Sequence, residues 1–207
     1  MPWKADQVYT KPNPELIAYL QSLEGFSFEL FLVNDLEGIN SEWARSFMLS
    51  DQPNENSFRK HSLPKDGLLI IKPAETDKAI YEHDWDFADA IVPTEMELNP
   101  GLTENQLKLM ALLESLHKKF NFPFLYYHCL KRGGLVEREY AIVFDERIRV
   151  YTYDCDNKKE LELADNGPIE LETTVLQTSL LHLDLALPTW YFVLHDSFDW
   201  KRYRVIK

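Results

Sequence analysis

Apolar residues recur with a helical period in two long segments of the chain. The first predicted helix covers residues 14–23 and has Asn13 as its N-cap. The stronger one covers residues 103–120, where Thr103 and Gln106 form a capping box. Its predicted apolar face consists of Leu107, Met110, Leu113, Leu116 and Phe120.

Two further segments have helical patterns. Leucines at positions 176, 180, 183 and 187 are spaced as on one face of a helix, which Pro188 ends. Residues 40–49 predict a short helix, and the polar residues 51–60 that follow predict a loop.

Alternating or continuous apolar runs predict the strands. Residues 26–33 alternate in part, residues 68–71 follow an Asp66-Gly67 turn, and residues 190–194 are uniformly apolar. Four more strands, separated by short polar or glycine-containing turns, are predicted at 124–130, 136–144, 147–153 and 160–163. Since strands joined by such turns pair antiparallel, the segment from about 124 to 163 predicts a β meander.

These elements together predict a single α+β domain over residues 1–207, with a mainly antiparallel sheet and helices packed on one of its faces. A hydrophobic fraction of 45% is enough for a packed core. The first residues contain no apolar leader, and no window of about 18 residues is free of polar interruptions, so neither a signal peptide nor a transmembrane helix is predicted. Two cysteines predict no disulfide framework, which makes the cytoplasm the expected location.

The net charge of −12 is unevenly distributed. Residues 1–100 carry 18 acidic and 8 basic side chains, whereas residues 101–207 carry 16 and 14. A negative surface repels nucleic-acid phosphates and anionic lipids, so binding to nucleic acid or to a membrane is not expected. It favours a basic protein as the partner, although an acidic surface also serves solubility alone.

Acidic residues are densest between Pro73 and Glu97, where the chain has eight carboxylates and one lysine. Aromatic residues are interspersed among them, and carboxylates beside aromatic rings suit the recognition of Lys and Arg. The predicted partner-binding residues are Tyr81, Glu82, Asp84, Trp85, Asp86 and Asp89. The alternative is a solvated acidic loop whose aromatic residues point into the core.

This acidic stretch has two structural interpretations. In a strand, the aromatic residues and His83 share one face and the carboxylates share the other. In a helix, Asp84 shares a face with Ile80 and Phe87, which would bury a carboxylate. The extended interpretation avoids that cost and is preferred.

No local motif predicts a catalytic residue, a cofactor site or a metal site. The chain has no phosphate-binding glycine loop, no serine nucleophile elbow and no paired histidine spacing. The acidic groups at 84–89 and 154–160 lack the glycine and terminal glutamate of a calcium-binding loop, and a polar hairpin turn explains the second group.

The two cysteines are not predicted to be reactive. Cys155 lies between Asp154 and Asp156, whose charges disfavour a thiolate. Cys129 is predicted to be a core residue, and it points away from the adjacent His128 because neighbouring strand residues alternate.

Five basic residues lie on the predicted meander: Lys131, Arg132, Arg138, Arg147 and Arg149. The three arginines beyond the first turn are expected to pair across strands with Glu137, Glu139 or Glu146. If they share one face instead, the molecule is bipolar, with an acidic N-terminal half and a basic meander.

The sequence favours a binding protein over an enzyme. We expect a cytoplasmic acidic protein that holds a basic protein, as an immunity-type or antitoxin-type inhibitor does. One alternative is a hydrolase-like enzyme that combines His83, His128, His182 or His195 with distant carboxylates. His182 and Asp184 are not expected to act together, because a helix separates them. Another alternative is a homo-oligomeric structural protein.

Overall fold

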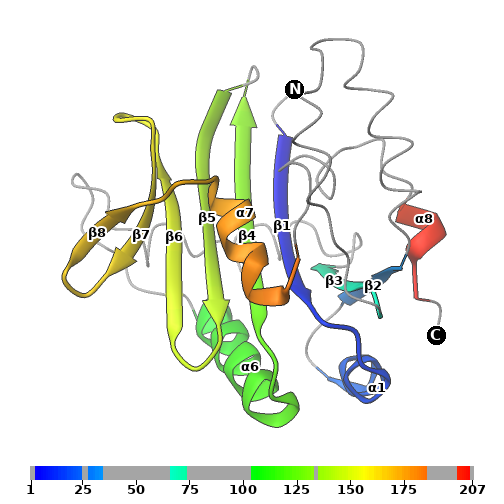
Figure 1. Ribbon diagram of the computed structural model, residues 1–207. Coiled ribbons are helices and arrows are strands. Elements are labelled where there is room, and N and C mark those ends of the chain that lie inside the picture. The colour runs from blue at the N-terminus through cyan, green and yellow to red at the C-terminus, as the bar shows by residue number, and fades with distance from the viewer. Residues whose placement is uncertain are drawn as a thin grey trace.

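The computed structural model describes residues 3–24, 28–34, 66–73, 104–132, 135–185 and 200–205. Their strands form one antiparallel sheet in the order β2-β3-β1-β4-β5-β6-β7-β8 (Figure 1). This architecture confirms the predicted α+β class and the meander, which supplies β4 to β7. The elements predicted at 40–49 and 190–194 and the capping box of the long helix lie outside the described residues.

The strands are β1 (Trp3–Thr10), β2 (Phe28–Val33), β3 (Leu68–Pro73), β4 (Phe124–Arg132), β5 (Leu135–Phe144), β6 (Ile148–Asp154), β7 (Lys159–Ala164) and β8 (Gly167–Glu170). The helices are α1 (Pro14–Ser22), α6 (Glu104–Phe120), α7 (Val175–Leu180), the 3-10 helix η2 (Leu181–Leu183) and α8 (Trp200–Tyr203). None of the helices in the described ranges is long and apolar enough to cross a membrane.

Local sequence signals explain several of these boundaries. The Asn13 side chain accepts hydrogen bonds from the backbone N–H groups of Glu15 and Leu16, which confirms it as the N-cap of α1. Asp154 closes the β6–β7 hairpin by accepting bonds from the N–H groups of Asp156 and Asn157, both at 3.0 Å. The second acidic group is therefore part of a polar turn, as predicted.

Two strands of the sheet were not predicted. β1 lies in the middle of the sheet between β3 and β4, and β8 forms one edge. The buried polar residues Gln7 and Thr10 of β1 obscure its alternation, and both are satisfied: Tyr9 Oη donates to Gln7, and Thr10 Oγ1 donates to the carbonyl of Pro123. A strand of this composition has no clear apolar signature.

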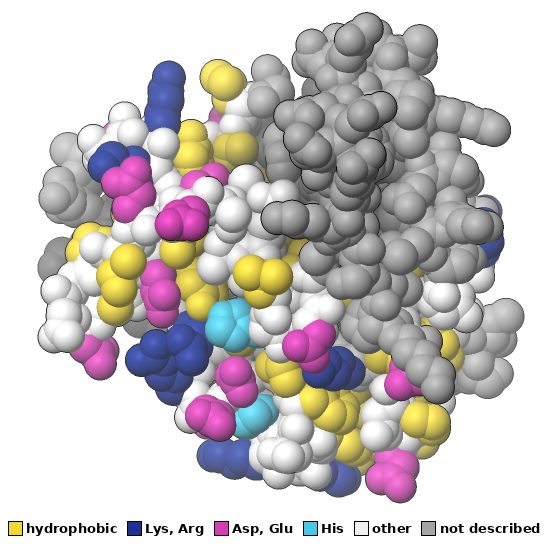
Figure 2. Space-filling view, viewed as in Figure 1, with side chains coloured by type: hydrophobic (Ala, Val, Ile, Leu, Met, Phe, Trp, Pro, Cys, Tyr) yellow, Lys and Arg dark blue, Asp and Glu magenta, His cyan; other side chains and the backbone are white. Residues whose placement is uncertain are grey.

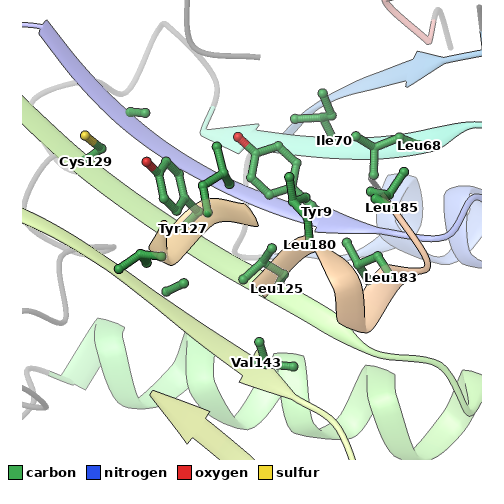
Figure 3. Close-up of a cluster of buried hydrophobic side chains, with 14 of the residues drawn as sticks. Tyr9, Leu68, Ile70, Leu125, Tyr127, Cys129, Val143, Leu180, Leu183 and Leu185 are labelled. Atoms are coloured by element: carbon green, nitrogen blue, oxygen red, sulfur yellow. The ribbon is translucent and has the colours of Figure 1, made fainter. Parts of the chain in front are cut away.

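Helices cover both faces of the sheet, not one face as predicted. α7, η2 and α8 pack on one face, whereas α1 and α6 pack on the other. The alternation within β4 explains this, because Leu125 and Tyr127 belong to the first core cluster and Phe124 and Tyr126 to the second. Figure 3 shows the first cluster, in which Leu180, Leu183 and Leu185 lie against Tyr9, Leu125 and Tyr127.

The apolar face of α6 differs in part from the predicted one. Leu107 is 53% exposed, whereas Leu109 is 1% exposed and packs in the second core cluster. The two residues are about 200° apart around the helix axis, so they cannot share a face. Leu113 and Leu116 are buried as predicted. The sequence therefore predicted the helix, but the buried face lies at a different angle around the helix axis than the predicted one.

Both edges of the sheet are protected against pairing with another strand. On β2, Val205 N–H donates to Leu30 O at 2.8 Å and Arg204 pairs with Phe31. On β8, Leu171 N–H donates inward to Glu160 O, so the alternation directs the backbone of Pro168 outward. Since proline offers no N–H, this edge is poorly suited to receive a further strand.

Candidate functional site

The predicted partner-binding residues lie outside the described part of the chain. Tyr81, Glu82, Asp84, Trp85, Asp86 and Asp89 all fall between β3 and α6 in the sequence. Neither the strand nor the helix interpretation of this acidic stretch is tested. Its role in binding therefore stays a prediction, and the site described below is built from other residues.

Charge is segregated within the C-terminal half, although its total is nearly balanced. Residues 135–185 carry twelve carboxylates and five basic side chains, a net of −7. Residues 104–132 carry five basic and two acidic side chains, and residues 200–205 carry three basic and no acidic ones. Negative charge thus gathers on the β5–β8 part of the sheet and around α7, while α6, with the adjoining β4, and α8 are basic.

The ion pairs of the meander bear on the alternative of a shared basic face. Arg147 lies 3.9 Å from Glu162 of β7 and so pairs with a carboxylate other than the three expected. Lys159 pairs with Glu170 across β7 and β8 at 2.6 Å. Within residues 135–185 the basic side chains are outnumbered by acidic ones, and Figure 2 shows Lys and Arg side chains close to Asp and Glu on the face it views.

A histidine, a tyrosine and a carboxylate from three elements meet on the face that carries α7. His182 of η2 has its Nε2 atom 2.8 Å from the Tyr151 hydroxyl of β6. Its Nδ1 atom lies 3.8 Å from a carboxylate oxygen of Asp145, in the turn between β5 and β6. Arg149 and Glu162 act on the same imidazole electrostatically. This His182 cluster is the nearest approach to a catalytic constellation among the described residues.

In the His182 cluster, the imidazole of His182 and the hydroxyl of Tyr151 are both neutral and are hydrogen-bonded to each other. Burial, followed by the positive charge of Arg149, lowers the pKa of His182, against the opposing effects of Asp145 and Glu162. Burial and then the Glu162 charge raise the pKa of Tyr151, so its hydroxyl stays protonated and donates to His182. The hydroxyl is therefore not activated as a nucleophile.

The geometry of the cluster suits a structural role better than catalysis. The Tyr151 residue is only 2% exposed, so a substrate cannot approach its hydroxyl. The Nε2 atom of His182 is already engaged by that hydroxyl, which prevents it from acting as a general base on a substrate. The cluster thus fastens η2 to the β5–β6 hairpin.

We expect the lowered pKa of His182 to make stability depend on pH. Because the pKa is lower in the folded state, the unfolded chain binds more protons near pH 6.5 and below. This contribution is fully present above the unfolded pKa and is lost as pH falls through the folded pKa. In urea denaturation at pH 7.5 and 5.0, wild type should lose more stability than His182→Gln. An equal loss in both proteins would contradict this expectation.

A second histidine, His128, is buried on the face of the sheet opposite α7. It is 1% exposed, and its Nδ1 atom lies 2.7 Å from Asp6 Oδ1, which also accepts a bond from the Tyr126 hydroxyl at 3.0 Å. The His128 ring stacks on Tyr140 with centroids 4.9 Å apart. Its Nε2 atom is buried without a hydrogen-bond partner. A group so enclosed supports the centre of the sheet and is closed to substrates.

The cysteines occupy the environments that the sequence predicts. Cys129 is buried in the first core cluster, on the face opposite His128. Burial and then the charges of Asp154 and Asp156 raise the pKa of the Cys155 thiol, so a thiolate is disfavoured. Within the described ranges, no group of three or more His, Cys, Asp or Glu side chains is arranged to hold a metal ion.

The histidine sites show what sequence reasoning missed. His182 was considered with Asp184, but Asp184 pairs with Lys11, and it is Asp145, 37 positions away, that lies near His182. The Asp145-Glu146 turn was visible in the sequence, yet nothing local indicates which helix end it meets. His83 and His195 lie outside the described residues.

Comparison with family models, curated proteins and solved structures finds no match for this chain.

Proposed function

We propose that this protein binds a basic protein partner through an acidic surface and acts in the cytoplasm as an immunity-type or antitoxin-type inhibitor does. The observation that carries the proposal is the separation of charge along the chain. The acidic stretch between Pro73 and Glu97 and the acidic region 135–185 have the same sign, whereas the basic residues concentrate in other segments. Such a distribution favours the approach of a cationic partner to the acidic segments.

The two acidic regions have different parts in this proposal. Residues 81–89 supply the anchors, because Trp85 and Tyr81 offer aromatic contact area beside four carboxylates. The region 135–185 contributes to the long-range field that speeds the encounter, since its exposed carboxylates include Glu146 and Asp165. The core of the interface lies at the aromatic residues.

The described residues favour this proposal over the enzyme alternative. Of the four histidines that the enzyme alternative uses, the structure describes His128 and His182, which are respectively buried and engaged by a buried tyrosine. Neither presents a free ring nitrogen at an accessible surface in a pocket. A binding function requires no such group and is compatible with both arrangements.

Edge-to-edge association, one route to a homo-oligomer, is also disfavoured. The outer side of β2 pairs with residues 204–205, and β8 presents Pro168 at the other edge. A homo-oligomeric structural protein would need a different surface. The binding proposal uses charges that repel a second copy of the same acidic region.

An affinity capture from the native cell tests the proposal. The tagged protein should retain a partner with a high isoelectric point at low salt and release it as salt rises, because screening weakens exposed charge contacts. The same capture with Asp84→Asn/Asp86→Asn should recover less partner, and Glu24→Gln, an exposed carboxylate outside both acidic regions, serves as the control. Retention of an acidic partner, or of a basic one with no response to salt, would overturn the proposal.

Replacing Trp85 by alanine is expected to weaken binding to the captured partner by about 2 kcal/mol or more, which is roughly thirtyfold in Kd. An aromatic anchor at the centre of an interface loses both contact area and cation–π attraction when it is truncated. Leu181→Ala, which truncates a side chain 61% exposed on η2, is the matched control and should leave Kd unchanged. Calorimetric titration measures both, and an unchanged Kd for Trp85→Ala would sink the proposed anchor.

A further inference from the structure

An open pocket of about 180 Å³ lies between the end of α6 and the turn that joins β5 to β6. One wall comes from the last turns of α6, and the other comes from the end of β5, the turn and the start of β6. The lining side chains are Glu114, His117, Lys118, Phe144, Asp145, Glu146, Arg147 and Ile148. The pocket thus combines two apolar residues with a ring of charged ones.

The apolar part of the pocket suits an aliphatic stem. Phe144 is 1% exposed and belongs to the core beneath α6, so it forms a fixed floor. Ile148 pairs with Phe144 across the hairpin and is 44% exposed, so part of its side chain is open to a guest. A guest that covers Ile148 would bury apolar surface without disturbing the core.

The charged part of the pocket favours a cation. The lysine and the arginine of its lining already have carboxylate partners, because Lys118 lies 3.8 Å from Glu114 and Arg147 lies 3.9 Å from Glu162. The third basic residue, His117, has its Nδ1 atom 3.0 Å from the backbone carbonyl of Phe122. Glu146 is exposed and has no ion-pair partner within the described part of the chain. The end of α6 adds the partial negative charge of a helix C-terminus, which the basic residues His117, Lys118 and Lys119 of its last turn offset in part.

Long aliphatic stems with a cationic head are the side chains of lysine and arginine. We infer that the pocket between α6 and the β5–β6 turn receives a lysine or arginine side chain of the basic partner, with the stem against Ile148 and the head at Glu146. This inference rests on the proposed function, since it assigns a second contact point to the same partner. It places that contact on α6 and the β5–β6 turn, away from residues 81–89 in the sequence.

A titration followed by NMR tests this inference on the full-length chain. The ¹⁵N-labelled protein is titrated at pH 7 with the blocked tripeptide Gly-Arg-Gly, and in parallel with Gly-citrulline-Gly, which keeps the shape but lacks the charge. Amide shifts should change at residues 114–118 and 144–148 with the arginine peptide and stay constant with the citrulline peptide. Shift changes confined to other acidic surfaces, or an equal response to both peptides, would overturn the inference.

Glu146→Gln and Glu172→Gln form the matched pair of variants. Both replace an exposed carboxylate of region 135–185 by its neutral isostere, but only Glu146 lines the pocket. Glu146→Gln should weaken binding of the arginine peptide by about two- to fivefold, the range of a single exposed charge pair. Glu172→Gln should leave it unchanged. Equal binding by Glu146→Gln and wild type would overturn the inference.

The two proposals can fail separately. If the arginine peptide avoids the pocket while the captured partner still depends on Trp85 and on salt, the pocket inference is wrong and the proposed function stands. If the arginine peptide occupies the pocket while the captured partner responds neither to salt nor to Trp85→Ala, the proposed function is wrong and the pocket remains a cation site.

Discussion

Replacing Asp6 by alanine is expected to lower the free energy of unfolding by about 3 to 5 kcal/mol. Asp6 Oδ1 accepts hydrogen bonds from His128 and from the Tyr126 hydroxyl, and it lies on the central strand β1. Both partners are almost fully buried, so water cannot take the place of the lost carboxylate. Urea denaturation at pH 7 measures the effect.

A double variant separates the two sources of this loss. Removing Asp6 alone deprives buried polar groups of their acceptor, whereas removing His128 as well eliminates one of those groups. Asp6→Ala/His128→Leu should therefore be less destabilised than the sum of its two single variants. If Asp6→Ala lowered the free energy of unfolding by less than about 1 kcal/mol, the expectation would be wrong, because a loss that small is typical of a solvent-exposed ion pair.

The Asp6–His128 pair also explains why β1 could not be predicted from the sequence. Residues 3–10 contain Asp6, Gln7 and Thr10, which read as polar and exposed when neighbours are unknown. The partners of Asp6 and Thr10, such as the Pro123 carbonyl for Thr10, are more than 100 positions away. The meander is the opposite case, because its strands alternate and its turns carry local signals such as Asp154 with Asn157. Local chemistry thus predicted the hairpins but not the central strand.

The same distinction applies to the candidate sites. The sequence located the acidic stretch at 81–89, since a charge run is visible in any local window. The pocket beside Glu146 was invisible, because it forms only where the end of α6 meets the β5–β6 turn. The half-by-half charge count also concealed the acidic character of residues 135–185, which basic residues in α6, β4 and α8 offset. A shorter counting window would have found it.

Charge of one sign at two separate segments has a consequence for binding. A partner that contacts both regions would gain from each without needing a large apolar interface. For the same reason, the interaction should weaken steeply with salt, more steeply than the folding of either protein.

Leu109→Ala is expected to destabilise the protein by about 2 to 5 kcal/mol, whereas Leu107→Ala should change stability by less than about 0.5 kcal/mol. Leu109 is 1% exposed and packs in the core cluster beneath α6, and Leu107 is 53% exposed two positions earlier on the same helix. The substitution is identical and the helix is the same, so differences in helix propensity cancel. Only the orientation of the side chain remains to cause the difference.

The comparison decides which face of α6 meets the sheet. If the buried face of α6 included Leu107, Leu109→Ala would be neutral and Leu107→Ala would be costly. The observed packing predicts the opposite result. Urea denaturation of both variants, with Leu116→Ala as a position that is buried in either case, gives the answer. Equal losses at 107 and 109 would contradict both orientations, because residues about 200° apart on one helix cannot be buried equally against a single sheet.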